Sequence, residues 1–160
     1  MSAADKIIAL SDLGPWRAGQ RAAGRRVVVT NGCFDLLHAG HVTYLEAAAA
    51  HGDILLVGVN DDAGVRELKG PTRPLNHEGD RALVLAALGC VGAATVFHGA
   101  TAVEFLRVAQ PDVYVKGGDY SLETLNQEER AVVEGGGGRF VFIHFLEGRS
   151  TSGLVKKMTK

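Results

Sequence analysis

Two histidines, three positions apart, are the residues of this sequence best suited to chemistry on phosphate groups. His38 and His41 close the stretch Thr-Asn-Gly-Cys-Phe-Asp-Leu-Leu-His-Ala-Gly-His at residues 30–41. Imidazole N–H groups can donate hydrogen bonds to oxygens whose charge grows during displacement at phosphorus. Capping or packing is the alternative role for each histidine, and zinc binding is disfavoured because no third ligand is suitably spaced. We therefore predict that His38 and His41 are catalytic, acting by transition-state stabilisation without covalent catalysis.

The residues before this pair form a loop that could bring backbone N–H groups close to phosphate. Gly32 follows a β-branched run and Gly40 precedes a helical segment, so both allow close approach of a ligand. Asp35 has two open roles: it could orient the loop or a metal ion, or accept backbone N–H bonds in a turn. Cys33 is better explained as a small packing residue than as a nucleophile, because no base pattern accompanies it.

The hydrophobic pattern predicts the scaffold that holds this loop. Compact apolar runs predict strands at residues 26–30, 53–59, 91–98, 112–116 and 139–145. Apolar spacing and capping residues predict helices at residues 11–23, 41–50, 76–88, 102–110 and 150–157, with Asn76 as one N-cap. This alternation implies an α/β fold with a Rossmann-like, open, parallel, five-stranded sheet and helices on both faces. Residues 1–160 are predicted to be a single domain, with residues 1–25 as an N-terminal helical extension.

Composition and charge limit the partners. The 160 residues are 46% hydrophobic, and 17 Lys and Arg against 18 Asp and Glu give a formal net charge of −1. This charge offers no long-range attraction for nucleic acid or an anionic membrane, so any anion site must be local. Cys33 and Cys90 form no metal-binding pattern, and a disulfide is not expected. We find no basic leader or apolar run of membrane length, which favours a cytoplasmic protein without a membrane partner.

Ligands of parallel α/β sheets bind at the carboxyl ends of the strands, which directs attention to the later loops. Lys69 lies in one of them, beside Gly70 and Pro71, and could move over a polyphosphate. A solvated surface role is the alternative for this lysine. Arg81 interrupts the apolar face of a predicted helix, and a buried guanidinium needs an anion. It is expected to pair with a carboxylate such as Asp61 or Asp62, which we favour, or to support a phosphate site.

Two further segments combine glycine, hydroxyl and charged residues. Residues 116–120 read Lys-Gly-Gly-Asp-Tyr directly after a predicted strand, so the backbone can approach a ligand while Lys116 or Asp119 reaches its polar groups. A turn without a ligand is the alternative. Residues 150–152 read Ser-Thr-Ser at a predicted helix start, where hydroxyls and free N–H groups can hold an anion or simply cap the helix.

These segments together resemble the cytidylyltransferase-like nucleotidyltransferase superfamily, which carries a His-x-Gly-His signature. Within it, they are similar to the branch that adenylylates D-glycero-β-D-manno-heptose 1-phosphate to make ADP-heptose. The resemblance rests on residues 30–41, 68–76, 115–120 and 147–152, in this order, and extends over residues 27–157. The Lys-Gly-Gly-Asp-Tyr segment is the part that points to the heptose branch.

The resemblance implies a role for each segment. Lys69 is implied to be catalytic, in contact with the phosphates of the reacting pair. Nucleotide binding is implied for Asn31, Gly32, Cys33, Phe34, Gly40, Lys116, Gly117, Gly118, Asp119, Gly148, Arg149, Ser150, Thr151 and Ser152. Substrate binding is assigned to Asp35, Arg81 and Tyr120, and no protein residue is assigned to a metal. Arg149 departs from the smaller residue common in relatives, so both a phosphate contact and solvent exposure remain open for it.

The implied reaction is transfer of AMP from ATP to a sugar 1-phosphate, with Mg²⁺ and Lys69 balancing charge and pyrophosphate leaving past the two histidines. The acceptor phosphate, with a second pKa of about 6, needs no general base. The alternatives are a CTP-dependent glycerol 3-phosphate enzyme, an ATP-dependent enzyme for another acceptor such as a flavin or pantetheine phosphate, and a non-catalytic nucleotide-binding module. The resemblance also implies a homodimer and a separate sugar kinase that supplies the 1-phosphate.

Overall fold

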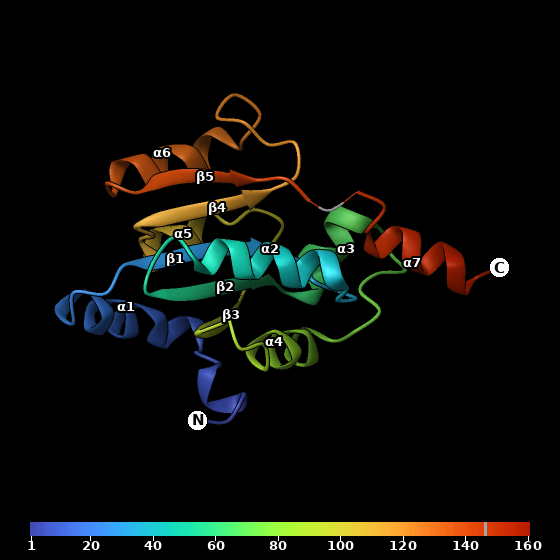
Figure 1. The fold of residues 1–160 in the computed structure, drawn as a ribbon, viewed down its shortest axis with the longest axis horizontal. Helices are drawn as coiled ribbons and strands as arrows, with labels where there is room; N and C mark the ends of the chain where they lie inside the picture. Colours follow the sequence, from blue (N-terminus) through green and yellow to red (C-terminus); the bar gives the residue numbers. More distant parts are fainter. Residues whose placement is uncertain (146) are drawn as a thin grey trace.

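Five parallel strands form one sheet in the order β3-β2-β1-β4-β5 (Figure 1). The computed structural model describes residues 1–145 and 147–160. The strands are β1 (Val27–Gly32), β2 (Ile54–Asn60), β3 (Ala93–Phe97), β4 (Val113–Gly117) and β5 (Arg139–Ile143). Each falls on a predicted apolar run, so the predicted α/β, Rossmann-like, five-stranded parallel sheet is confirmed.

The strand order reverses at β1, which positions the binding site. β1 pairs in parallel with β2 on one side, where Val28 lies opposite Leu55. On its other side it pairs in parallel with β4, where Val28 lies opposite Val113. The connections that follow β1 and β4 therefore leave the sheet in opposite directions and open a crevice at the carboxyl ends of the two strands.

Seven α-helices and two short 3₁₀ helices accompany the sheet in the described part of the chain. The α-helices are α1 (Leu13–Ala22), α2 (Ala39–Ala49), α3 (Asp62–Lys69), α4 (Glu78–Ala86), α5 (Val103–Ala109), α6 (Gln127–Gly135) and α7 (Thr151–Met158). The 3₁₀ helices are η1 (Ala4–Lys6) and η2 (Leu10–Asp12). Helices α3 and α6 lie outside the predicted helices, and no helix among the described residues is long and apolar enough to cross a membrane.

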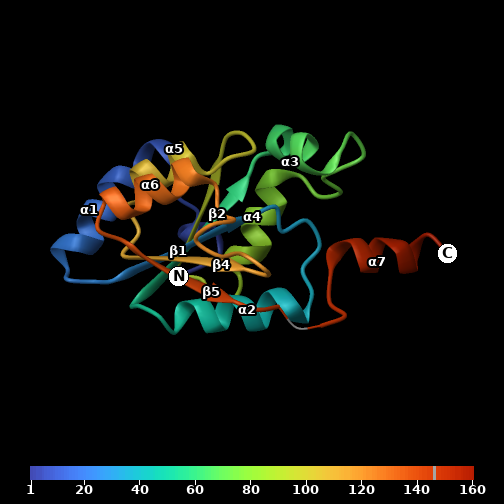
Figure 2. The ribbon, with the colours of Figure 1, turned by 90° about the horizontal axis from the view of Figure 1, so that it is seen from above.

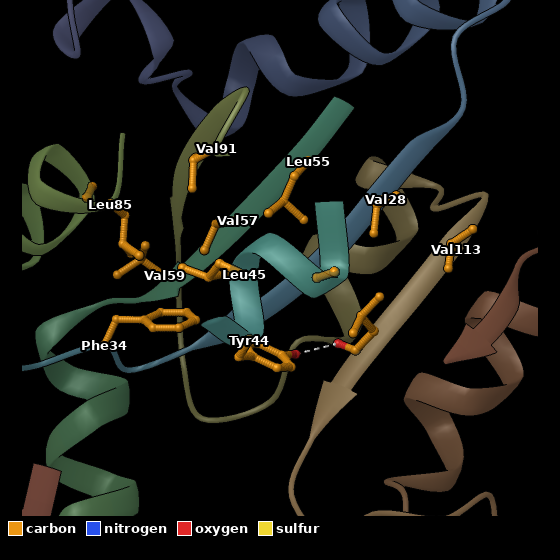
Figure 3. Close-up of a cluster of buried hydrophobic side chains, with 13 residues drawn as sticks. Val28, Phe34, Tyr44, Leu45, Leu55, Val57, Val59, Leu85, Val91 and Val113 are labelled. Carbon is orange, nitrogen blue, oxygen red and sulfur yellow. Dashed lines mark hydrogen bonds between the residues drawn. The ribbon is translucent and has the colours of Figure 1, made fainter. Parts of the chain in front are cut away.

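Two hydrophobic layers fix the helices to the sheet. Leu45 of α2 and Leu85 of α4 belong to the core cluster drawn in Figure 3. Leu13 of α1, Phe105 of α5 and Val133 of α6 belong to a second cluster. Helices α2 and α4 therefore pack on one face of the sheet and α1, α5 and α6 on the other, as Figure 2 shows for α2 against α5 and α6. Helix α7 contains no buried residue and projects away from both layers.

The N-terminal segment is attached to the sheet through specific contacts. Ile7 forms a parallel bridge with Ala94 at the β3 edge. Arg17 of α1 is 3% exposed, and its Nε donates to the backbone oxygens of Ala109 and Gln110. The other end of this guanidinium pairs with Asp112 at 2.9 Å. The residues predicted to be an N-terminal extension thus lie against the β3 edge and the α5–β4 turn.

Candidate functional site

A cavity of about 700 Å³ lies over the carboxyl ends of β1, β2 and β4. The predicted site residues that line it are Asn31, Gly32, Cys33, Phe34, Asp35, His38, His41, Lys69, Lys116, Gly117, Tyr120, Arg149, Ser150, Thr151 and Ser152. The predicted site residues that do not line it are Gly40, Arg81, Gly118, Asp119 and Gly148. Four segments that are distant in the sequence thus converge on one space of a size suited to small-molecule ligands.

The turn between β1 and α2 places the two histidines at the start of the helix. Phe34 has a φ of 47°, an unusual left-handed conformation for an aromatic residue, and its ring packs edge-on against His41 at 5.5 Å. His38 is the N-cap of α2, and its Nδ1 accepts the N–H of Gly40 at 3.1 Å. A Cβ at Gly40 would lie 2.9 Å from the His38 ring, so this close return of the imidazole requires glycine.

The hydrogen bonds of the two imidazoles decide which ring nitrogens remain for a ligand. His41 Nδ1 accepts the backbone N–H of His38 at 3.4 Å, as His38 Nδ1 accepts that of Gly40. Both Nδ1 atoms are acceptors, so the proton of each neutral ring is assigned to Nε2. The ring centroids are 4.0 Å apart. The capping role and the donor role therefore coexist, because they use different nitrogens of the same side chain.

Burial keeps both imidazoles neutral. It lowers the pKa of His41 to about 4, with a smaller contribution from the charge of His38. Burial also lowers the pKa of His38, and the positive charge of Arg149 lowers it further. At neutral pH the pair thus presents two neutral Nε2–H groups, each able to donate a hydrogen bond to a phosphate oxygen.

The lowered pKa of His41 predicts an acid-sensitive contribution to stability. The unfolded chain binds a proton at this residue below about pH 6.5, whereas the folded chain does so only below about pH 4. The contribution of neutral His41 to the free energy of unfolding is therefore complete above pH 6.5, and it is lost as the pH falls towards 4. Between pH 7 and 4 the wild type should lose roughly 2 kcal/mol more unfolding free energy than His41→Asn, measured by urea denaturation. Parallel pH profiles for the two proteins would contradict this.

Lys69 is the last residue of α3 rather than part of the predicted loop. The N-cap of this helix is Asp61, whose carboxylate accepts the Gly64 N–H at 2.7 Å. The helix end carries the exposed Lys69 side chain to the cavity wall, near Cys33. Burial raises the pKa of the Cys33 thiol, although the charge of Lys69 opposes it. Cys33 is thus a protonated wall residue, in agreement with the packing role favoured from the sequence.

Asp35 holds the loop between α3 and α4 in place. Its carboxylate accepts the Nε of Arg73 at 2.7 Å and the backbone N–H groups of Leu75 and Asn76 at 2.8 and 2.9 Å. Burial would raise the pKa of Asp35, but these hydrogen bonds outweigh it and keep the pKa below its usual value. The geometry supports the loop-orienting alternative, because the carboxylate oxygens predicted to bind substrate are already engaged by the protein.

Asn76 has a different role from the predicted helix cap. Its Nδ2 donates to the backbone oxygen of Asp35 at 2.7 Å. The N-cap of α4 is His77, whose Nδ1 accepts the N–H of Gly79. The predicted cap was therefore wrong by one residue, because Asp35 recruits Asn76 through contacts that are long-range in sequence.

Arg81 is fully engaged beneath the cavity. Its side chain is 0% exposed and pairs with Asp62 at 2.9 Å. Its other nitrogens donate to the backbone oxygens of Cys33 at 2.6 Å and Asn76 at 3.0 Å. The favoured pairing with an aspartate is present, whereas the predicted substrate contact is not supported by this position. Arg81 joins the loops that form two walls of the cavity.

The segment after β4 contributes a cation and an aromatic wall. The Lys116 ammonium lies 4.8 Å from the ring centroid of Tyr120 and 5.7 Å from that of Tyr114. Burial lowers the pKa of Lys116, and the negative charge of Glu129 partly opposes this. At Gly117 a Cβ would lie 2.5 Å from the Phe145 ring, so glycine lets this ring close the cavity wall. Gly118 and Asp119 continue the turn outside the cavity.

The start of α7 combines capping with exposure to the cavity. Ser150 is the N-cap, and its Oγ accepts the N–H of Gly153 at 2.9 Å. Thr151 Oγ1 donates to the backbone oxygen of Leu36 at 3.0 Å, which connects α7 to the β1–α2 turn. The proton of the Thr151 hydroxyl is thus used within the protein, whereas Ser150 Oγ accepts a bond and keeps its own proton for a ligand. Ser152 and Arg149 also line the cavity, and the charge of Arg149 lies near enough to His38 to lower its pKa.

Comparison with known proteins identifies the family of this fold and site. The cytidylyltransferase-like family model matches residues 29–144. The chain belongs to this family. Relatives of this cytidylyltransferase-like chain include the bifunctional protein HldE of Citrifermentans bemidjiense, 49% identical over 153 residues that cover 96% of this chain and 31% of that protein. HldE of Wolinella succinogenes is 53% identical over 139 residues, which cover 86% of this chain and 28% of that protein. The chain therefore spans about a third of the length of these relatives.

Solved structures support the same family fold. The lipopolysaccharide core biosynthesis protein of Thermoplasma volcanium has a TM-score of 0.64 at 25% identity, covering 79% of this chain and 100% of that one. Pantoate-beta-alanine ligase of Francisella tularensis has a TM-score of 0.61 at 12% identity, covering 91% of this chain and 68% of that one. The second likeness concerns the fold alone.

Several residues that line the cavity of this cytidylyltransferase-like chain were not assigned to the site from the sequence. They are Tyr44, Asn60, Leu68, Arg73, Ala100, Thr101, Thr124, Leu125, Asn126, Glu129 and Phe145. Helix α6 carries the most informative of them, and Asn126 caps it by accepting the N–H groups of Glu128 and Glu129. An Asn followed by acidic residues is a helix-start signal, so the start of this helix, although not its place in the site, was readable from the sequence.

The donor groups of the cytidylyltransferase-like site fit a nucleotide-bound metal rather than a protein-bound one. No cluster of three or more His, Cys, Asp or Glu that could hold a metal occurs among the described residues. Of the two carboxylates that line the cavity, Asp35 accepts protein hydrogen bonds at both oxygens, and Glu129 has its Oε1 occupied by the Ala102 N–H, so the pair offers one free carboxylate oxygen at most. Mg²⁺ commonly keeps several waters and binds substrate phosphates. Phosphate oxygens would therefore be its main ligands here.

Proposed function

We propose that this chain is an adenylyltransferase that moves AMP from ATP to a sugar 1-phosphate and releases pyrophosphate. The preferred acceptor is D-glycero-β-D-manno-heptose 1-phosphate, which would give ADP-heptose. The observation that carries the proposal is the pair His38 and His41 at a helix start, which line one cavity with Lys69 and have Nδ1 engaged as an acceptor, so that the proton of each neutral ring is assigned to Nε2. The resemblance to the heptose branch and the HldE relatives support the choice of acceptor.

The arrangement favours positioning and charge stabilisation over covalent catalysis. The cavity thiol, Cys33, is held in its protonated form by burial. A sugar 1-phosphate has a second pKa of about 6 and is largely dianionic at neutral pH, so it attacks without a general base. The α-phosphorus gains a bond to the acceptor oxygen as its bond to the pyrophosphate oxygen breaks in line. The leaving charge develops beside His38, His41 and Lys69.

The remaining partners form part of the same proposal. Mg²⁺ would neutralise triphosphate charge while bound mainly by phosphate oxygens. We propose a cytoplasmic homodimer without nucleic-acid or membrane partners, supplied with 1-phosphate by a sugar kinase. The net charge of −1 agrees with the absence of polyanion partners.

The test is pyrophosphate release with each of four nucleoside triphosphates against heptose, hexose and glycerol phosphates. The expected result is release with ATP and a sugar 1-phosphate, highest with the heptose, and its loss on chelation of Mg²⁺. Preference for CTP with glycerol 3-phosphate would replace the proposal with its closest alternative. ATP binding without release of pyrophosphate from ATP in the presence of any acceptor would identify a non-catalytic nucleotide-binding module.

A further inference from the structure

A buried carboxylate lies in the cavity wall on the far side of the sheet from the histidines. Glu129 of α6 is 6% exposed and lines the cavity. Helix α6 packs on the sheet face opposite α2, which carries His38 and His41 (Figure 2). The cavity therefore has a donor-rich end above α2 and an acceptor-bearing end above α6.

The hydrogen bonds of Glu129 leave acceptor capacity unused. Its Oε1 accepts the backbone N–H of Ala102 at 2.8 Å. Its Oε2 lies 3.3 Å from the Tyr114 hydroxyl, but that hydroxyl also lies 2.6 Å from Asn31 Oδ1. A hydroxyl has one proton, so the shorter contact to Asn31 leaves Oε2 with a weak donor at best. A buried carboxylate oxygen without a strong donor is stabilised by a ligand that donates a hydrogen bond to it.

The charge of Glu129 determines which part of the ligand can bind at its end of the cavity. Glu129 repels phosphate, and the charge of Lys116 offsets this only in part, so we place the phosphate groups at the end with His38, His41 and Lys69. Hydroxyl groups donate to carboxylates. The residues expected to bind nucleotide come from the β1 and β4 ends and the start of α7, which leaves the wall of Thr101, Asn126 and Glu129 for the acceptor.

We infer that Glu129 binds hydroxyl groups of the acceptor, at the end remote from its phosphate, and so selects a polyhydroxylated acceptor. This inference rests on the proposed sugar-phosphate adenylyltransferase activity. Glu129 is a specificity residue and takes no part in bond making or breaking.

The test compares Glu129→Gln with Glu128→Gln in steady-state pyrophosphate release. Glutamine keeps the size of Glu129 and an acceptor for Ala102 but loses the charge. Glu128 lies on the same helix, is 65% exposed and pairs only with Arg107 among the described residues, so it controls for loss of one negative charge. Glu129→Gln should raise the KM for the sugar 1-phosphate about tenfold or more and leave the KM for ATP within about twofold. Glu128→Gln should change neither.

A series of deoxy sugar 1-phosphates separates direct contact from a structural effect. For the analogue that lacks the hydroxyl bound by Glu129, wild type and Glu129→Gln should have the same KM. An equal rise of both KM values, a rise for ATP alone, or an unchanged acceptor KM would overturn the inference while leaving the proposed activity intact. Wild-type protein inactive with every sugar 1-phosphate would overturn the proposed function first. If Glu129→Gln does not fold, Glu129→Asp, which withdraws the carboxylate by one methylene, serves in the same comparison.

Discussion

Replacing His41 by asparagine is expected to lower the rate of pyrophosphate release by about 10²–10³-fold, the usual cost of removing one preorganised donor to a developing charge. The asparagine amide oxygen can take the place of His41 Nδ1 and continue to accept the His38 N–H, but no atom reaches the former Nε2 position. The substitution therefore separates the capping function of the side chain from its donor function. The KM for ATP should change far less than kcat, because the donor matters most as charge develops.

The complementary variant is His41→Gln. Its longer amide can reach the Nε2 position and should retain more activity than His41→Asn, while losing the bond to His38 and some stability. His51→Asn, at the opposite end of α2, is the matched control and should behave as wild type. Equal activity of His41→Asn and wild type in single-turnover pyrophosphate release would remove His41 from the catalytic mechanism.

Replacing Arg81 by methionine is expected to lower the free energy of unfolding by about 3 kcal/mol, because one substitution leaves several buried acceptors without a donor. The guanidinium is 0% exposed and serves Asp62 and the backbone oxygens of Cys33 and Asn76. For a domain of this length, the melting temperature should fall by roughly 10 °C. Calorimetry and urea unfolding measure both quantities.

The same experiment decides between the two predicted roles of Arg81. Arg66→Met, on the exposed surface of α3, removes one positive charge without a buried partner and should leave stability within about 0.5 kcal/mol of wild type. If Arg81→Met kept wild-type stability but raised the KM for the sugar phosphate, the arginine would be a substrate ligand. A loss of stability with a smaller change in KM supports its structural role.

The strands and the binding edge of the sheet could be predicted because their signals are local. Val27–Gly32 and Ile54–Asn60 are compact β-branched or apolar runs, and five such runs separated by helical segments permit few topologies. Helices α3 and α6 were missed although both are amphipathic, because they are short and polar on average and each buries only two residues, which leaves a small apolar face to recognise. Their caps, Asp61 and Asn126, were the available clues.

The sequence by itself determined the sheet, the loops that bear the site and the residue types gathered there, since these depend on spacing within a few residues. Only the tertiary structure decided which atoms remain free for a ligand. His38 and His41 present Nε2 because their Nδ1 atoms cap α2, and Asp35 is withdrawn from substrate by Arg73. Glu129 enters the site through packing of α6 on the far face of the sheet. Such partners are distant in sequence, and their pairing depends on the geometry of the assembled layers rather than on any local pattern.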